Sequence, residues 1–209
     1  MKKVVILTVA ALLIASTAAF AQDMVTGLTG KGLKAGLNLA NVTGNDAPDD
    51  TKMKMGFAVG GFITYAFSDL FAVQPELLYT MKGAKVQPAG GTEASTTYNY
   101  LEIPVLFKVL LAGGGNFKPN FYAGPAVAFL LSASSDPEVP GYDVKDATKS
   151  TDFGLIGGVG ADLLMGTGPG KITFDVRYDV GLSSLDNVDD GIDAKVNNSA
   201  ITFLVGYGF

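Results

Sequence analysis

The sequence predicts an all-β fold, an eight-stranded antiparallel up-and-down transmembrane β-barrel, from three observations. Apolar and polar residues alternate over eight separate segments, the charges inside these segments share one face, and short and long connections alternate between them. Strict alternation is the pattern of a β-strand whose two faces meet different surroundings. A barrel in a bilayer needs one face for lipid and one for its lumen.

The first four segments span residues 31–42, 53–67, 71–82 and 98–111. In the first, leucine and alanine alternate with lysine, glycine and asparagine. In the second, methionine, aromatic and β-branched residues alternate with lysine and small residues. The third and fourth set aromatic and aliphatic residues against polar and charged ones, and the turn Ser68-Asp69 predicts a tight hairpin before the third.

The last four segments span residues 120–132, 152–164, 171–182 and 200–209. The fifth and sixth set phenylalanine, leucine and valine against alanine, glycine and one aspartate, and the seventh is the most regular of all. The eighth ends the chain on Phe209, with Gly206 and Gly208 on its other face. We expect it to pair with the segment 31–42, because an open strand edge in lipid would leave backbone groups unsatisfied.

Charged residues separate onto one face of every segment. Under this phasing we expect no charge on the apolar face, and we expect these charges to face the lumen: Lys34, Lys54, Glu76, Lys82, Glu102, Lys108, Asp162, Lys171, Asp175, Arg177 and Asp179. A charge facing lipid near the midplane costs about 2–4 kcal/mol. A soluble barrel would instead place apolar side chains inside and polar ones outside, so the pattern favours a membrane barrel.

The connections provide a second, independent prediction. Those near 68–70, 112–119 and 165–170 are short, whereas those at 43–52, 83–97, 133–151 and 183–198 are longer and polar. Periplasmic turns and extracellular loops of transmembrane barrels differ in this way. We therefore expect both termini on the periplasmic side, and we expect the four long loops to bind any extracellular ligand.

Residues 1–21 have the features of a secretory signal peptide. Two lysines precede a short apolar run, and Ala19-Phe20-Ala21 provides the small residues of a cleavage site. Residues 22–209 then form one β-barrel domain. The chain lacks cysteine and carries a net charge of −5, which gives no electrostatic basis for binding nucleic acid.

No catalytic, cofactor or metal site is predicted. The chain contains no histidine, the general base on which most small-barrel hydrolases depend. The acidic loop 186–193 departs from the EF-hand pattern, because Val188 and Asn197 stand where ligands are required. We therefore expect neither an enzyme nor a calcium-binding protein.

Two motifs, QPELLY at 74–79 and EIP at 102–104, together with the closing ITFLVGYGF, resemble the porin-like outer-membrane β-barrel family. The resemblance covers nearly the whole chain after residue 21. It implies an eight-stranded barrel in the outer membrane, in contact with outer-membrane lipid, but it does not imply conduction. Phe209 also resembles the C-terminal signal by which the outer-membrane assembly machinery recognises such proteins.

We expect an ion-pair network in the lumen, formed by Glu76, Glu102, Lys108, Asp162, Asp175, Arg177 and Asp179. Folding the sixth segment onto the seventh places Gly158 opposite Arg177 and Gly160 opposite Asp175, which leaves room for the guanidinium to cross the lumen. Because arginine binds carboxylates in a bidentate manner, Arg177 with Glu76 or Glu102 is the predicted centre of the network.

Two functions remain open from the sequence. Because eight strands enclose a space just wide enough for side chains, the first is a structural or surface-interaction role with a plugged lumen. The second is a small passive or gated pore for ions or small solutes. Pro75, Pro104 and Pro125 fall inside strands, and each predicts a bulge, since proline removes a donor from the ladder.

Overall fold

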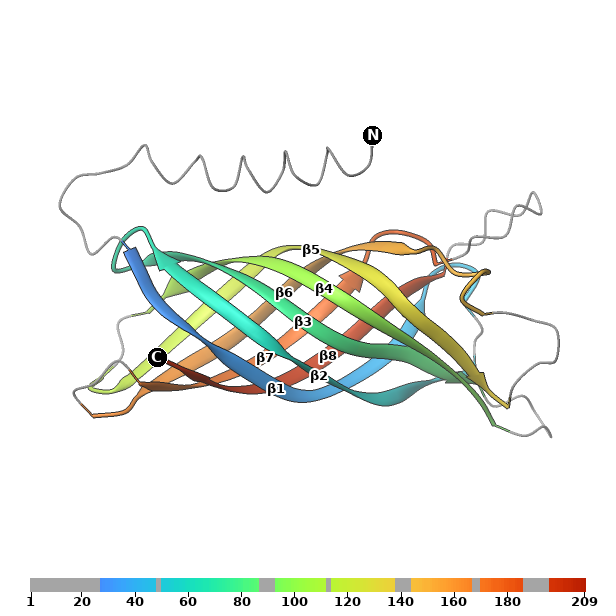
Figure 1. Cartoon of the computed structure of the whole chain (residues 1–209), viewed down its shortest axis with the longest axis horizontal. Helices are drawn as coiled ribbons and strands as arrows, with labels where there is room; N and C mark the ends of the chain where they lie inside the picture. The colour runs from blue at the N-terminus through green and yellow to red at the C-terminus, as the bar shows by residue number, and fades with distance from the viewer. Residues whose placement is uncertain are drawn as a thin grey trace.

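Eight antiparallel strands close into one barrel in the computed structural model, each strand hydrogen-bonded to the next and the last to the first (Figure 1). The structure describes residues 27–47, 50–86, 93–111, 114–137, 144–166, 170–185 and 196–209. The strands are β1 (Gly27–Thr43), β2 (Thr51–Ala66), β3 (Phe71–Val86), β4 (Ala94–Leu110), β5 (Phe117–Asp136), β6 (Thr151–Leu164), β7 (Lys171–Gly181) and β8 (Asn197–Gly208).

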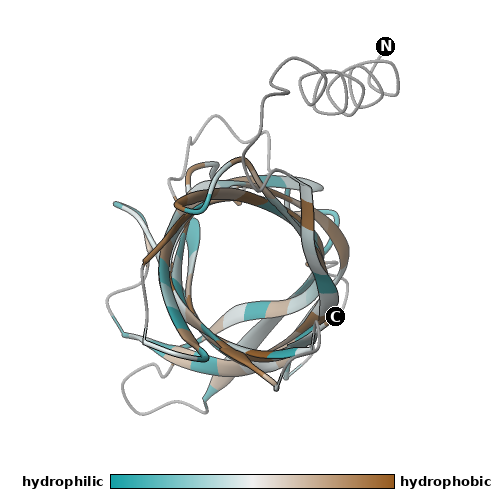
Figure 2. Ribbon diagram, turned by 90° about the vertical axis from the view of Figure 1, so that its left-hand side faces the viewer, coloured by the Kyte–Doolittle hydropathy of each residue, from teal (hydrophilic) through white to brown (hydrophobic). Residues whose placement is uncertain are grey.

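The predicted fold class and the predicted closing pair are confirmed. β8 pairs with β1 from Gly32 opposite Gly208 to Thr43 opposite Asn197, and Figure 2 shows the strands forming a ring. The predicted signal peptide 1–21 and the acidic loop 186–193 lie outside the described residues. No helix in the described part of the chain is long and apolar enough to cross a membrane.

Several strands are longer than predicted at the end of the barrel that carries the long connections. β3 and β4 continue to pair through Gly83 opposite Thr97 and Lys85 opposite Ser95, so much of the predicted loop 83–97 is strand. β5 likewise extends to Asp136. The added residues are mostly small or polar, with no large apolar side chains alternating along either face, so alternation gives no sign of them.

The bulges predicted at the three prolines are wrong. Pro75 pairs with Val105, Pro104 with Ala126 and Pro125 with Leu155, and the register is the same on both sides of each. Each proline removes one backbone donor, but its fixed φ remains compatible with extended chain, so the strand continues through it. The register shifts lie elsewhere, between Leu28 and Gly30, Met53 and Ala58, and Asn99 and Tyr100.

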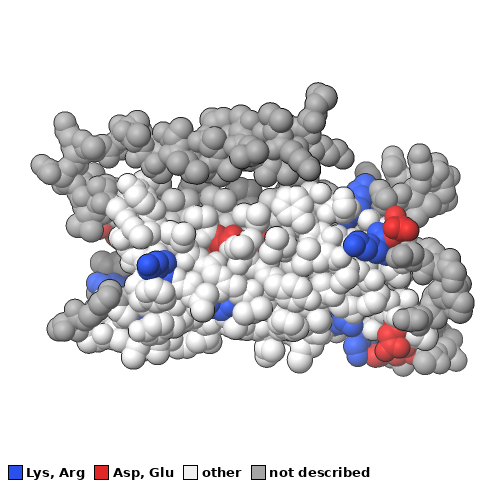
Figure 3. Space-filling view, viewed as in Figure 1, with Lys and Arg blue, Asp and Glu red and all other residues white. Residues whose placement is uncertain are grey.

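Large apolar side chains cover the outer wall of the barrel, as the alternation predicts. Leu33 is 71% exposed, and Phe107, Phe153 and Val205 are more than half exposed. In Figure 3 most of the visible wall is white; small red and blue patches show within it, and the larger charged groups lie toward the ends. This belt is the surface that lipid covers in a transmembrane barrel.

Lys31 contradicts the expectation that no charge lies on the apolar face. Its partner across the β1–β2 pair is Ile63, which is half exposed on the outer wall, and Lys31 itself is exposed. β1 begins at Gly27, so Lys31 lies inside the strand rather than at its start. It stands near the end with the short turns, where a lysine can extend its ammonium out of the apolar belt.

Both ends of the described chain lie at the end of the barrel with the short turns (Figure 1). There the backbone of Phe209 pairs with that of Lys31, the N–H of each donating to the carbonyl of the other at 2.8 and 3.2 Å. Short turns mark the periplasmic side of such barrels, so this end is called the periplasmic end below.

Candidate functional site in the barrel lumen

Strand alternation brings the predicted inward charges together inside the barrel. Each of the seven predicted network residues is buried, with at most 9% of its surface exposed. Arg177 lies opposite Gly158 and Asp175 opposite Gly160 across the β6–β7 pair. A Cβ atom at Gly158 would lie 2.8 Å from Cβ of Arg177, so only glycine leaves the arginine side chain its place.

The central cluster consists of Lys34, Glu76, Asp175 and Arg177. Nη1 of Arg177 lies 2.7 Å from Oε2 of Glu76, and Nζ of Lys34 lies 2.7 Å from Oε1 of the same carboxylate. Lys34 also reaches Oδ2 of Asp175 at 2.9 Å. The four side chains are at most 4% exposed, and their charges cancel. The cluster thus links β1, β3 and β7 across the lumen.

The outer cluster lies on the side of the central cluster away from the periplasmic end and consists of Lys82, Glu102 and Asp179. Nζ of Lys82 lies 3.1 Å from Oε2 of Glu102 and also bonds Asp179. Glu102, the other partner considered for Arg177, therefore bonds a lysine of β3 instead. This cluster carries two acids and one base.

The remaining predicted residues lie toward the periplasmic end. Gln74 connects Lys108 to the central cluster, because its Nε2 donates to Oε1 of Glu76 at 2.7 Å, whereas Lys171 and Asp162 form a separate ion pair. Nζ of Lys171 lies 2.7 Å from Oδ2 of Asp162. Nζ of Lys108 donates to Oε1 of Gln74 at 3.1 Å and lies 5.8 Å from the centroid of the Tyr122 ring. Within the described ranges, no carboxylate lies within ion-pair distance of Lys108.

The predicted network omitted Lys34, Lys82 and Lys171, although the alternation had placed all three inside the barrel. A second omission is Asp152, which is 4% exposed and accepts hydrogen bonds from Oγ of Ser183 at 2.6 Å and from Nδ2 of Asn198 at 2.8 Å. Asp152 shares the even-numbered phase of Asp162 on the same strand, and that phase would have identified it.

An apolar layer lies beyond the outer cluster, toward the end with the long connections. It is formed by Val42 of β1, Ala84 of β3 and Leu185, which follows β7, with Tyr98 and Val196 packed against them. The backbone holds Leu185 in place, because its N–H donates to the carbonyl of Val196 at 2.8 Å. In the described part of the chain, apolar side chains therefore lie over the charged lumen.

At the same end an exposed ion pair joins Lys85 to Glu93, with Nζ 2.7 Å from Oε1. The hydrogen bond and positive charge of Lys85 lower the pKa of Glu93 below its ordinary value. No group of three or more acidic, histidine or cysteine side chains among the described residues is arranged to hold a metal ion.

The lumen thus contains charges paired with each other and removed from solvent. Residues 20–187 match the model of the outer membrane protein beta-barrel domain family. No curated protein matches the chain at a significant level.

Among solved structures, the chain is similar to Neisserial surface protein A, with 16% identity, a TM-score of 0.52, and coverage of 87% of this chain and 97% of that one. It is also similar to OprG from Pseudomonas aeruginosa, with 13% identity, a TM-score of 0.45, and coverage of 89% and 98%. A third is Ail of Yersinia pestis, solved with the heparin analogue sucrose octasulfate, with 16% identity, a TM-score of 0.41, and coverage of 86% and 98%. At such identities the similarity concerns the fold alone.

Proposed function

The chain belongs to the outer membrane protein beta-barrel domain family and is located in the outer membrane, and from this premise we propose that it has a structural or surface-interaction role with a plugged lumen. We propose no catalytic role. The proposal depends on the charged side chains that fill the lumen and on the apolar layer and long connections at the extracellular end.

The observation that carries the proposal is the central cluster. Arg177 from β7 and Lys34 from β1 bond the same carboxylate, Glu76 of β3, and these side chains are at most 3% exposed. Because an eight-stranded barrel is just wide enough to be filled by side chains, a bonded cluster that joins β1, β3 and β7 across the lumen supports a plug at this level. An ion passing this level would have to break charge-assisted hydrogen bonds.

The apolar layer of Val42, Ala84 and Leu185 supports the same proposal. An ion entering from the extracellular side would meet these apolar side chains, and contact with them carries a desolvation cost. A barrel without a path leaves the connections 43–52, 83–97, 133–151 and 183–198 as the surface for an extracellular ligand. We propose that Phe209 and β8 are the part that the outer-membrane assembly machinery recognises.

A small gated pore is the second candidate, and one observation favours it. In the periplasmic half of the lumen, both polar side-chain atoms of Asn120 and Oγ1 of Thr173 are buried and lack a hydrogen-bond partner within the described chain. Such groups in native proteins bond water. A wet periplasmic half would become a path if the central and outer clusters opened.

Conductance in planar lipid bilayers tests the proposal. Three proteins are compared: the wild type, a variant with Glu76→Gln, Glu102→Gln and Arg177→Ala, and a matched control with the exposed pair Lys85→Gln and Glu93→Gln. We expect no discrete conductance steps from the wild type or the control. Reproducible steps from the wild type that change in the lumen variant and persist in the control would refute the plugged lumen and establish the pore.

A further inference from the structure

The outer wall at β8, β1, β2 and β3 carries two hollows that the lumen proposal does not use. The register sets its outward residues in rows across the strands: Phe209, Lys31 and Ile63; then Tyr207, Leu33 and Gly61; then Val205, Ala35 and Val59. Gly61 and Ala35 are small residues among large ones. The wall is therefore lower at these two positions than around them.

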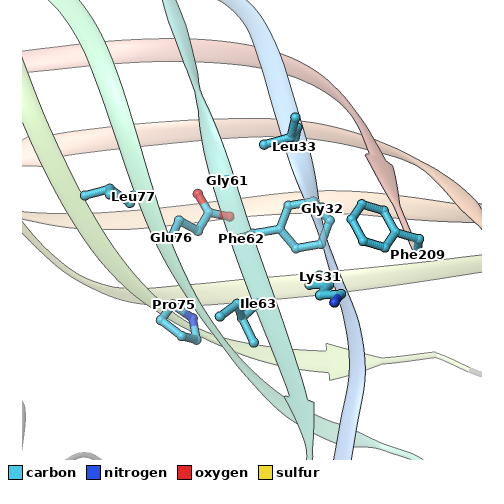
Figure 4. A pocket seen from close by; sticks show the side chains of 10 residues that line it. All are labelled: Lys31, Gly32, Leu33, Gly61, Phe62, Ile63, Pro75, Glu76, Leu77 and Phe209. Atoms are coloured by element: carbon cyan, nitrogen blue, oxygen red, sulfur yellow. The ribbon is translucent and has the colours of Figure 1, made fainter.

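The first hollow lies over Gly61 and has a volume of about 560 Å³. Leu33 of β1 borders it on one side, and Leu77 of β3, which pairs with Gly61, borders it on the other. Ile63, Lys31 and Phe209 line its periplasmic edge, as Figure 4 shows. The side chains at its rim are exposed and apolar apart from Lys31, so the hollow opens toward lipid. Phe62 and Glu76 also line it, but both are buried, and the Glu76 carboxylate is paired with Lys34 and Arg177 in the lumen.

The second hollow has a volume of about 450 Å³ and lies on the other side of Leu33, between β2 and β8. Ala35 and Gly206 form the floor of this hollow, and Val59, Val205 and Tyr207 form its rim. Leu33 borders both hollows and is 71% exposed. It is therefore a ridge between two apolar depressions of similar size.

Lys31 adds a positive charge at the periplasmic edge of this surface. Its Nζ lies 5.3 Å from the centroid of the Phe209 ring, and no carboxylate in the described ranges lies within ion-pair distance of it. Ile63, opposite Lys31, is three residues from the end of β2. At this height a lysine side chain reaches the headgroup region and attracts anionic lipid.

We propose that this surface binds one anionic phospholipid of the periplasmic leaflet, with its phosphate at Lys31 and its two acyl chains in the hollows on either side of Leu33. Two adjacent apolar depressions match a two-chain lipid. The Lys31 ammonium, which has no ion-pair partner within the described ranges, complements the charge of its phosphate. The site lies on the outer wall, so it does not depend on whether the lumen is plugged.

Native mass spectrometry of the refolded full-length barrel, released from detergent with added phosphatidylglycerol, tests the site. The wild type is compared with Lys31→Gln and Gly61→Leu, which fills the first hollow. The matched control is Lys118→Gln, because Lys118 is also an exposed lysine, located near the periplasmic end of β5. Heat-dependent gel mobility confirms that each variant is folded. Diacylglycerol supplies chains without phosphate, and inorganic phosphate supplies the anion without chains.

We expect one phosphatidylglycerol bound to the wild type and to the control, and about fivefold weaker binding to Lys31→Gln, the effect of one lysine at a membrane surface. Gly61→Leu should also weaken binding. Equal binding by the wild type and Lys31→Gln overturns the proposal. So does diacylglycerol bound as tightly as phosphatidylglycerol, or inorganic phosphate bound without a lipid.

Discussion

Replacing Arg177 with methionine should destabilise the barrel by about 3 kcal/mol, the lower end of the cost of removing one partner from a buried ion pair. The substitution preserves the apolar stem and deletes the charge. Glu76 then remains buried and keeps one charged partner within the described chain, Lys34, at 2.7 Å. This remaining contact is the reason for choosing the lower end of the range.

The charges of the central cluster predict how a second substitution will combine with the first. With two acids and two bases the cluster is neutral, and Arg177→Met leaves it with one excess negative charge. Glu76→Gln alone leaves one excess positive charge. The double variant restores neutrality, because Lys34 still reaches Asp175 at 2.9 Å. The free energy of unfolding of the double variant should therefore exceed the value expected from adding the two single effects by about 2–3 kcal/mol. This coupling is near the upper limit for residues in contact.

Equilibrium urea unfolding in lipid vesicles, followed by β circular dichroism and by gel mobility without heating, provides the four free energies of this cycle. The exposed pair Lys85 and Glu93 provides a control cycle, in which each change should be within about 1 kcal/mol of the wild type. If the two central substitutions add without coupling, then Arg177 and Glu76 do not stabilise each other as their 2.7 Å separation implies.

Three further predictions concern the barrel wall and its ends. Gly158→Ala should lower the free energy of unfolding by about 1–3 kcal/mol through overpacking, because the new Cβ would lie 2.6 Å from a backbone oxygen of β7. The control Gly157→Ala places its Cβ in open space and should leave the same free energy unchanged. Deleting Phe209 should lower the amount of barrel in outer-membrane fractions of cells, and an unchanged amount would contradict its role as an assembly signal. In a carbon NMR titration the Glu93 carboxyl should titrate below its ordinary range, and Lys85→Met should return it there. Since the charged form of Glu93 is favoured, any stability from this pair is present at neutral pH and is lost as the pH falls through the lowered pKa.

The faces of the strands could be predicted from the sequence because lipid imposes a strict rule on one of them. Alternation identified the buried charges, since period two fixes which side of the sheet a residue occupies. The closing pair of β8 with β1 followed from a second rule, that lipid does not tolerate an open strand edge. Alternation did not find the extensions at Ser95 and Asp136, where no large apolar side chains alternate with polar ones. Lys31 was not recognised as an outward-facing charge because it is the first residue of the predicted segment 31–42. No residue before it had been assigned to a face of the strand.

The pairing of charges could be predicted only in part, because alternation gives a residue's face but not its height. Arg177 had two candidate partners, Glu76 and Glu102, on adjacent strands. Which of them Arg177 bonds depends on the stagger of the strands, summed around the closed barrel. The alternation within each strand does not reveal that stagger. Lys108 faces inward as expected, but its height places it beside Gln74 rather than beside a carboxylate.

The pairing of Lys34 with Asp175 also bears on the order in which the barrel assembles. The two residues are 141 positions apart, and β8 lies between their strands in the ring. Their bond cannot form until β8 has docked against β1, so it reports the last step of closure. A sheet that has not yet closed keeps these charges on an open face, where lipid would penalise each of them. Completion of the ring removes this cost by enclosing both charges in the lumen.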